Sequence, residues 1–201
     1  MATENHSDHG ILARWSITEA ELTNLVDSNP SLRGMLFGYV AELKLEKYLF
    51  DHDEIEDLGK ADDHDRTKKG DRSIIYKGKA LVLESKSLQT NSIHKIVTGW
   101  EGKAQVDGSD RRTVIFDDGT TLATTLLAFG EFDLLAVNCF AFGSDTWRWQ
   151  FCLNSDLPHS TWAKYTEGQR RKLIASLVSV KWPPEPPFSD NIFSILDLLV
   201  S

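Results

Sequence analysis

The chain has 201 residues, of which 41% are hydrophobic and 26% are charged, and its formal net charge is -8. This length and composition suit one α/β or α+β domain with a substantial core. No apolar run approaches the roughly 20 residues of a membrane span, and the first ten residues lack the apolar segment of a signal peptide, so we expect a cytoplasmic protein without a membrane partner. The acidic balance argues against a uniformly basic surface that wraps nucleic acid. The basic groups Lys68-Lys69, Arg111-Arg112 and Arg170-Arg171-Lys172 nevertheless leave a local basic surface open.

We divide the chain into three parts. Residues 1–15 are predicted to form a disordered tail. Residues 16–181 are predicted to form one α/β (α+β) domain, and residues 182–201 a proline-rich spacer with a short amphipathic helix.

Two helices are predicted first. Thr18 is a plausible N-cap, and Glu21 lies three residues later, which is the pattern of a capping box. This first helix spans residues 18–27. Asn29-Pro30 interrupts the pattern, and a longer helix is predicted from Ser31 to about residue 50.

Glu42 stands out on the longer helix. It has no cation at the i-4, i+3 or i+4 positions, and it shares a stripe with apolar side chains. A partly buried carboxylate that needs a partner is one interpretation, and a glutamate on the helix surface is the other.

Residues 51–69 read as a loop that is acidic and then basic. Within it, Asp62-Asp63-His64-Asp65 resembles a metal cluster in composition only. No predicted strand or helix holds these side chains in place, so we do not interpret them as ligands.

The next segment predicts a β-hairpin. Two β-prone runs flank Lys77-Gly78, a pair that suits a two-residue turn. That turn places Asp71 opposite Glu84 with Cβ atoms about 4.5–5.5 Å apart, and Lys86 on the same face. Two carboxylates so close repel unless a cation lies between them, so the hairpin predicts a divalent-metal site with a lysine beside it. A surface hairpin with a cross-strand ion pair is the alternative.

The Glu-x-Lys spacing alone is weak evidence for a metal site. It recurs at residues 42–44, on a predicted helix, and at residues 101–103, in a predicted turn. Only Glu84-Ser85-Lys86 ends a buried-type run and has an aspartate across a hairpin.

The second half of the chain predicts mostly strands. Residues 132–140 form the most apolar run there and suit a central strand. In order, we expect a polar connection over 87–99, short strands at 104–106, 113–116 and 120–127, the central strand, an antiparallel partner at 147–153 with one exposed face, and a helix from Ser160 or Thr161 to about Val180.

The C-terminal part begins with residues 182–187, which predict an extended polyproline spacer. The amphipathic segment 189–200 either packs back on the domain or docks on another chain, which would make it a dimerisation arm. Cys139 and Cys152 lack zinc-finger spacing and are expected to be reduced core residues.

The order of these elements resembles the PD-(D/E)XK nuclease superfamily, whose fold is restriction-endonuclease-like, with a mixed central β-sheet flanked by helices. Glu42 on a helix, Asp71 on one strand and Glu84-Ser85-Lys86 at the end of the next occupy the family's positions. The resemblance covers about residues 31–180, and 129–137 looks like a later core strand of restriction-type enzymes. The family's proline before the aspartate is Gly70 here.

The resemblance implies a Mg²⁺-dependent nuclease, with Mn²⁺ as a substitute. Asp71, Glu84 and the Ser85 carbonyl would bind the metal, Lys86 would orient the attacking water, and Glu42 would hold a water or the lysine. Gln89, Gln105 and Asp107 are weaker candidates for the rim of the site.

We therefore expect a DNA endonuclease of restriction, defence or recombination type, acting alone or as a homodimer. A catalytically silent module that binds nucleic acid or protein on the same fold is the alternative, and a metal-dependent hydrolase with another substrate is a third hypothesis.

Overall fold

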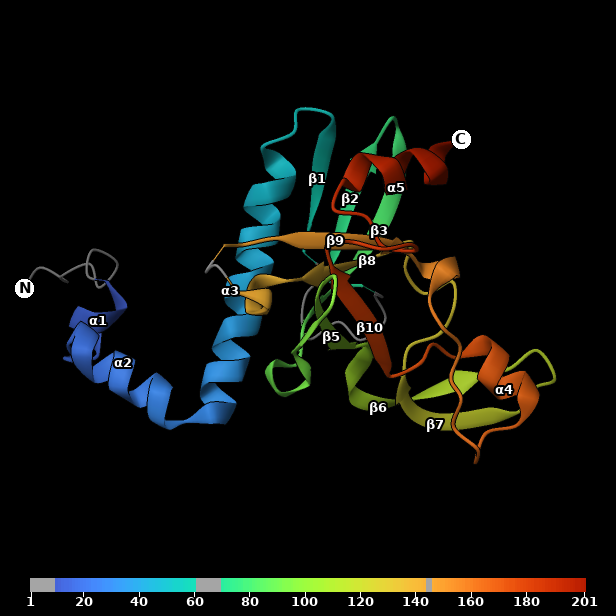
Figure 1. The fold of residues 1–201 in the computed structure, drawn as a ribbon, viewed down its shortest axis with the longest axis horizontal. Coiled ribbons are helices and arrows are strands. Elements are labelled where there is room, and N and C mark those ends of the chain that lie inside the picture. The colour runs from blue at the N-terminus through green and yellow to red at the C-terminus, as the bar shows by residue number, and fades with distance from the viewer. Residues whose placement is uncertain (1–9, 61–69, 144–145) are drawn as a thin grey trace, which may run out of the picture. The chain divides into compact units, whose positions relative to one another are not determined.

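The computed structural model describes residues 10–60, 70–143 and 146–201. Over these residues the protein is a mixed α+β structure with five α-helices, a mixed five-stranded sheet and two small antiparallel sheets (Figure 1). The predicted fold class is confirmed at this level. None of the described helices is long and apolar enough to cross a membrane. The chain divides into two compact units, of which the first ends at Ala41 and the second spans Glu42–Ser201.

The first unit contains α1 (Ile11–Arg14), α2 (Glu19–Ser28) and the beginning of α3 (Pro30–Phe50). α1 lies within the predicted tail, whose first nine residues are outside the described part. The predicted capping box is confirmed, because Thr18 Oγ1 accepts from Glu21 N at 3.2 Å and Glu21 Oε2 accepts from Thr18 N at 2.8 Å. Neither α1 nor α2 has a buried residue. The large apolar side chains of this unit that are exposed are Ile11, Trp15, Leu25, Met35, Leu36 and Tyr39.

The second unit is built on the five-stranded sheet, whose strand order is β1-β2-β3-β8-β9. The strands are β1 (Ile55–Lys60), β2 (Arg72–Tyr76), β3 (Lys79–Ser87), β8 (Leu134–Asn138) and β9 (Trp149–Leu153). β3 and β8 pair in parallel, and the other neighbours are antiparallel. The predicted central strand is confirmed, because β8 lies between β3 and β9 and all five of its residues are buried.

One face of this sheet is covered by the C-terminal half of α3 and by α5 (Ile192–Val200). Tyr48 of α3 stacks on Phe151 of β9, and Tyr76 of β2 contacts Phe193 of α5. Since α5 also buries three apolar side chains, it packs back on its own domain, as the first of the two predicted arrangements required. These side chains are Ile192, Ile195 and Leu196.

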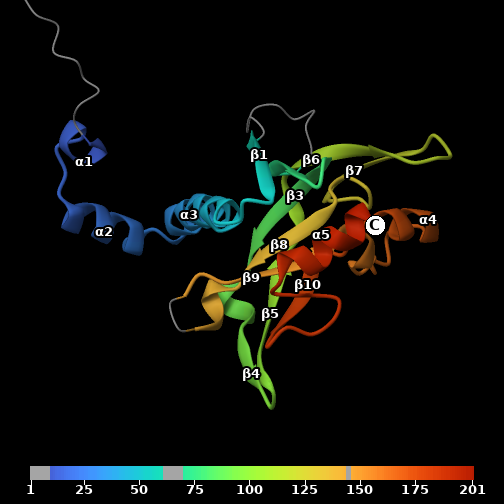
Figure 2. The same ribbon diagram turned by 90° about the horizontal axis from the view of Figure 1, so that it is seen from above.

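The opposite face packs on the first of the two small sheets, while the second shares a separate buried cluster with Tyr165 and Leu173. The first has the order β10-β5-β4, and the second is the pair β6-β7. Their bounds are β4 (His94–Ile96), β5 (Gly99–Gln105), β6 (Asp107–Ile115), β7 (Thr121–Leu126) and β10 (Leu177–Trp182). Leu135 and Val137 of β8 belong to one buried cluster with Val178 and Val180 of β10. Figure 2 shows β4 and the start of β5 extending away from the large sheet as a hairpin.

The helix predicted from Ser160 or Thr161 to Val180 is wrong. The segment contains only the short helix α4 (Glu167–Lys172), which is followed by β10. In β10, buried Val178 and Val180 alternate with exposed neighbours, which is the period of a strand and not of a helix. Pairing with β5 over six residues then outweighs the helix propensity of the preceding sequence.

Several connections also differ from the predictions. The predicted loop 51–69 contains β1, and residues 61–69, with the Asp62-Asp63-His64-Asp65 motif, lie outside the described residues. The polar connection 87–99 contains a 3-10 turn (Thr90–Ser92) and β4. Further 3-10 turns span Phe140–Phe142 and Asn154–Asp156.

The end of the domain is more enclosed than predicted. β9 has no exposed face, because four of its five residues are buried and the fifth is half-buried. The proline-rich segment is a turn and not an extended spacer, since Phe188 N donates to Glu185 O at 3.0 Å. Phe188 is buried, and Ser189 exchanges two backbone hydrogen bonds with Phe151, which anchors the segment to β9. Cys139 and Cys152 are free and buried, as predicted.

Candidate functional site

The predicted hairpin is present with the predicted turn. Lys77 and Gly78 form the loop with φ angles of 47° and 78°, which suits a two-residue turn with both central residues at positive φ. The ladder pairs Tyr76 with Lys79 and continues to Arg72 opposite Leu83. The register of β2 and β3 is therefore confirmed over all five residues of β2.

The β2–β3 ladder ends with the pair Arg72 and Leu83, so Asp71 lies just outside it. The Asp71 N–H donates to Leu83 O at 2.8 Å, although Leu83 already pairs with Arg72, and two residues opposite one is the pattern of a β-bulge. The predicted direct opposition of Asp71 and Glu84 is therefore wrong by one residue. Gly70 has a φ of +74°, and a Cβ there would lie 2.2 Å from Val82 Cγ1, so glycine is needed where the bulge begins.

The bulge turns the Asp71 carboxylate toward β3. Its Oδ2 accepts a hydrogen bond from Ser85 N at 2.7 Å. Because the N–H and C=O of a strand residue point to the same side, the Ser85 carbonyl also faces the end of β2. Asp71 and Ser85 line a cavity of about 10 Å³ together with Glu42, about the space of one water molecule.

Glu84 and Lys86 form a buried ion pair at the end of β3. Lys86 Nζ lies 2.6 Å from Glu84 Oε1, and Glu84 is 6% exposed. Burial, together with the neighbouring charge of Asp71, raises the pKa of Glu84 to about 7, although Lys86 opposes the shift. Two carboxylates thus interact closely although they do not face each other across the ladder.

The same electrostatics bring Glu42 to the site. Burial alone would lower the pKa of Lys86. The net shift is upward, because Glu84 and Asp71 favour the charged ammonium and Glu42 adds to their effect. Glu42 is half-buried and is not a fully exposed surface glutamate. All four side chains predicted to be functional therefore gather at one end of β3.

Three residues predicted for the rim form a chain. Gln89 Nε2 donates to Gln105 Oε1 at 2.7 Å, and Gln105 Nε2 lies 3.5 Å from Asp107 Oδ2. Burial raises the pKa of Asp107, and the charge of Lys86 is among the effects that oppose the shift, so the chain reaches the lysine of the site.

An ion pair next to the site was not predicted. Arg112 binds Glu131 through two guanidinium–carboxylate contacts, and Glu131 in turn contributes to the raised pKa of Glu84. Arg112 belongs to one of the basic pairs considered for a nucleic-acid surface, but it is half-buried and paired. The only sequence signal was the position of Glu131 next to the central apolar run.

The other basic residues considered for such a surface are also mostly engaged. Arg171 pairs with Glu167, and Lys172 Nζ lies 3.0 Å from Asp117 Oδ1. The Lys68-Lys69 pair lies outside the described residues. No cluster of three or more His, Cys, Asp or Glu side chains suited to a metal occurs in the described part, so a metal here would rely on two carboxylates and a carbonyl.

Of the other two Glu-x-Lys triplets, one supplies Glu42 to the site and the other lies elsewhere. Residues 42–44 are helical, as predicted, but Glu101 and Lys103 lie in β5 and not in a turn. Glu101 accepts from Ser179 Oγ at 2.5 Å, and Lys103 is exposed.

Comparison with protein-family models finds none that matches the chain, and comparisons with curated proteins and with solved structures find no significant match.

Proposed function

We propose that this protein is a Mg²⁺-dependent nuclease of the PD-(D/E)XK type, with a restriction-endonuclease-like domain that cleaves DNA internally. The observation that carries the proposal is the convergence of Asp71, Glu84 and Lys86 at the end of β3, with Glu42 beside them. Acids and a lysine in this order along the chain are what the superfamily resemblance implies.

The donor atoms suit magnesium. Mg²⁺ takes oxygen ligands and usually binds one or two protein carboxylates while keeping several waters. Asp71, Glu84 and the Ser85 carbonyl would hold it. Glu84 is buried beside a second carboxylate with its pKa raised to about 7, and a divalent cation would relieve that repulsion. A bound Mg²⁺ would supply charge neutralisation at the phosphate and make a nearby water more acidic.

The side chains of the protein would orient the attacking water and stabilise the transition state. Lys86 Nζ is placed to orient the attacking water and to stabilise negative charge on the phosphoryl oxygens in the transition state. Glu84 and Glu42 keep the lysine charged and in position. In the hydrolysis, the water oxygen bonds to phosphorus, the bond from phosphorus to one nucleoside oxygen breaks, and that oxygen takes up a proton.

The Gly70 position limits how closely the family motif is followed. Proline cannot adopt a φ of +74°, so the backbone before Asp71 differs from that of a chain with proline there. In this chain the bulge at Asp71 brings its carboxylate to the Ser85 N–H.

The test is incubation of the purified chain with supercoiled plasmid and with single-stranded DNA, in Mg²⁺ or Mn²⁺. D71N, E84Q and K86M should each lower cleavage by at least 100-fold, the order of magnitude attached to one transition-state donor. E101Q and K103M change another Glu-x-Lys triplet, which lies in β5, and serve as matched controls. If the parent cuts neither substrate, or the three variants cut as well as the parent, the proposal fails.

A catalytically silent binding module is the second candidate. The net charge of -8 and the pairing of Arg112, Arg171 and Lys172 with carboxylates favour it. It predicts binding without cleavage under all metal conditions.

A further inference from the structure

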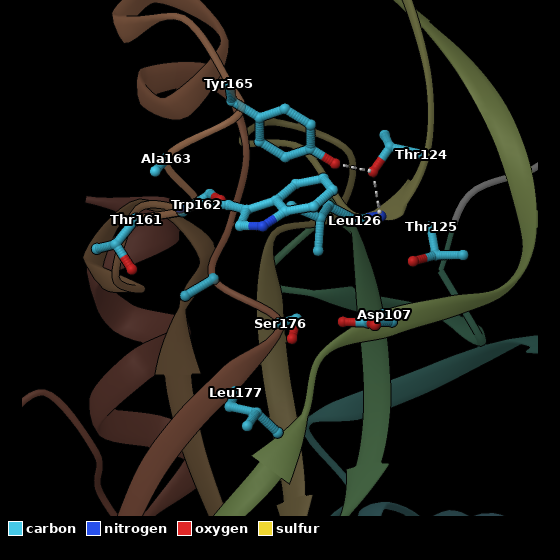
Figure 3. Close-up of a pocket in the computed structure, with 12 residues that line it drawn as sticks. Asp107, Thr124, Thr125, Leu126, Thr161, Trp162, Ala163, Tyr165, Ser176 and Leu177 are labelled. Carbon is cyan, nitrogen blue, oxygen red and sulfur yellow. Dashed lines mark hydrogen bonds between the residues drawn. The ribbon is translucent and has the colours of Figure 1, made fainter.

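A cavity of about 590 Å³ lies between β7 and the segment that leads to β10 (Figure 3). Its volume falls within the range of roughly 300–1,000 Å³ that is typical of small-molecule sites. Both hydroxyl-bearing and aromatic side chains line it. The cavity therefore offers a stacking surface and polar groups in one place.

Trp162 provides the stacking surface. It is 52% exposed, and its ring packs edge-to-face with Tyr165 at a centroid distance of 4.7 Å and an interplanar angle of 87°. Tyr165 is itself fixed, because its hydroxyl bonds Thr124 Oγ1 at 2.9 Å, and Thr124 Oγ1 accepts from Leu126 N. Figure 3 shows the indole beside Tyr165 within the cavity. A supported, half-exposed aromatic ring is the usual platform for a nucleobase.

Asp107 joins the cavity to the candidate site. Its carboxylate lines the cavity, and its charge interacts with that of Lys86. Its Oδ1 has no hydrogen-bond partner, while the carboxylate otherwise interacts with Gln105, at 3.5 Å from Oδ2, and with Thr125. A half-buried carboxylate with unused acceptor capacity calls for a donor.

We propose that this cavity binds one nucleobase of the substrate strand, stacked on Trp162 and recognised by Asp107. The inference rests on the proposed function and names the part of the substrate that reaches the site. Lys164 Nζ lies over the Trp162 ring, 5.4 Å from its centre, so a base that stacks on this face displaces the ammonium, which can then meet a neighbouring phosphate. A carboxylate accepts from amino groups, so guanine, cytosine and adenine, which each carry one, are favoured over thymine. Thymine is disfavoured because carbonyl oxygens flank its N3–H.

The test measures binding, so that it does not depend on cleavage. The full chain is titrated in EDTA with labelled ten-nucleotide oligo-dT that carries a central guanine, cytosine, thymine or abasic site, and fluorescence anisotropy is recorded. The parent should bind the guanine and cytosine probes more tightly than the abasic one. W162A should weaken binding of both by roughly 5- to 140-fold, the range for loss of one stacked base. D107N should remove the preference for guanine and cytosine over thymine.

Three variants act as controls. W162F keeps a stacking ring and should bind more tightly than W162A, which separates stacking from misfolding. W15A removes another exposed tryptophan that does not line the cavity, and it should bind like the parent. E84Q should also keep the base preference.

The outcomes separate the two proposals. The inference is overturned if W162A binds like the parent, if W162F binds no better than W162A, or if the preference survives D107N. If the base preference is present and depends on Trp162 and Asp107 while the parent cuts no DNA, the cavity is supported and the nuclease function is lost.

Discussion

Replacing Glu84 with glutamine should stabilise the metal-free protein at high pH and not at low pH. Burial and the charge of Asp71 raise the pKa of Glu84 from its ordinary 4.5 to about 7 in the folded protein. At about 1.4 kcal/mol per pKa unit, ionising this buried carboxyl costs the folded state about 3 kcal/mol. The folded protein binds this proton more tightly than the unfolded chain does. The contribution of Glu84 to stability is therefore fully present below pH 4.5 and is lost as the pH rises through 7.

Glutamine keeps an acceptor for Lys86 but has no charge to lose. The free energy of unfolding of E84Q relative to the parent should therefore rise by about 2–3 kcal/mol between pH 5 and pH 8, measured by urea unfolding in EDTA. E101Q is the control. The pKa of Glu101 is lowered from 4.5, so neither its folded nor its unfolded value lies in this window, and its difference from the parent should stay flat. An E84Q difference that is equal at pH 5 and pH 8 would refute the argument.

The same pair of proteins tests the metal site. At pH 8, Mg²⁺ that binds only the folded state should stabilise the parent by about 2.7 kcal/mol at a concentration 100 times its Kd. E84Q should gain much less, because one of the two carboxylates is gone. Equal gains for both proteins would place the metal elsewhere.

Three further substitutions test the backbone, the ion pair and the packing that support the site. G70A should cost more than about 1 kcal/mol, since its φ of +74° is strained for alanine and its Cβ would meet Val82, and an unchanged melting temperature would contradict this. R112M should cost about 3–5 kcal/mol in urea unfolding, because it leaves Glu131 half-buried without its cation, and a loss below 1 kcal/mol would count against the pair. L196A should cost about 2–5 kcal/mol in the same assay, since Leu196 is a fully buried side chain of α5, and no loss would mean that α5 is not part of the domain core.

Local patterns explain what could be predicted. The hairpin register follows from a two-residue turn and from alternation on either side of it, so Lys77-Gly78 determines the pairing down to Arg72. The capping box at Thr18 and Glu21 likewise depends on residues three positions apart. These features need no information about the rest of the chain.

Contacts between distant segments explain what could not be predicted. β10 is a strand because β5, some 75 residues earlier, pairs with it, and the helix predicted for this part of the chain is confined to α4. The bulge at Asp71 depends on how Gly70 packs on Val82. Asp107 reaches the candidate site through the packing of the small sheets, which no spacing in the sequence encodes.

The three Glu-x-Lys triplets show where chemical identity comes from. Two of them lie in strands, so neither the spacing nor the strand distinguishes them. Glu101 stays near solvent and accepts from Ser179, and its pKa is lowered, chiefly by that hydrogen bond. Glu84 ends a strand that pairs with fully buried β8, and burial there raises its pKa. Burial by the neighbouring strands, and not the motif, therefore makes the Glu84 triplet a candidate for metal chemistry and leaves the Glu101 triplet at the surface.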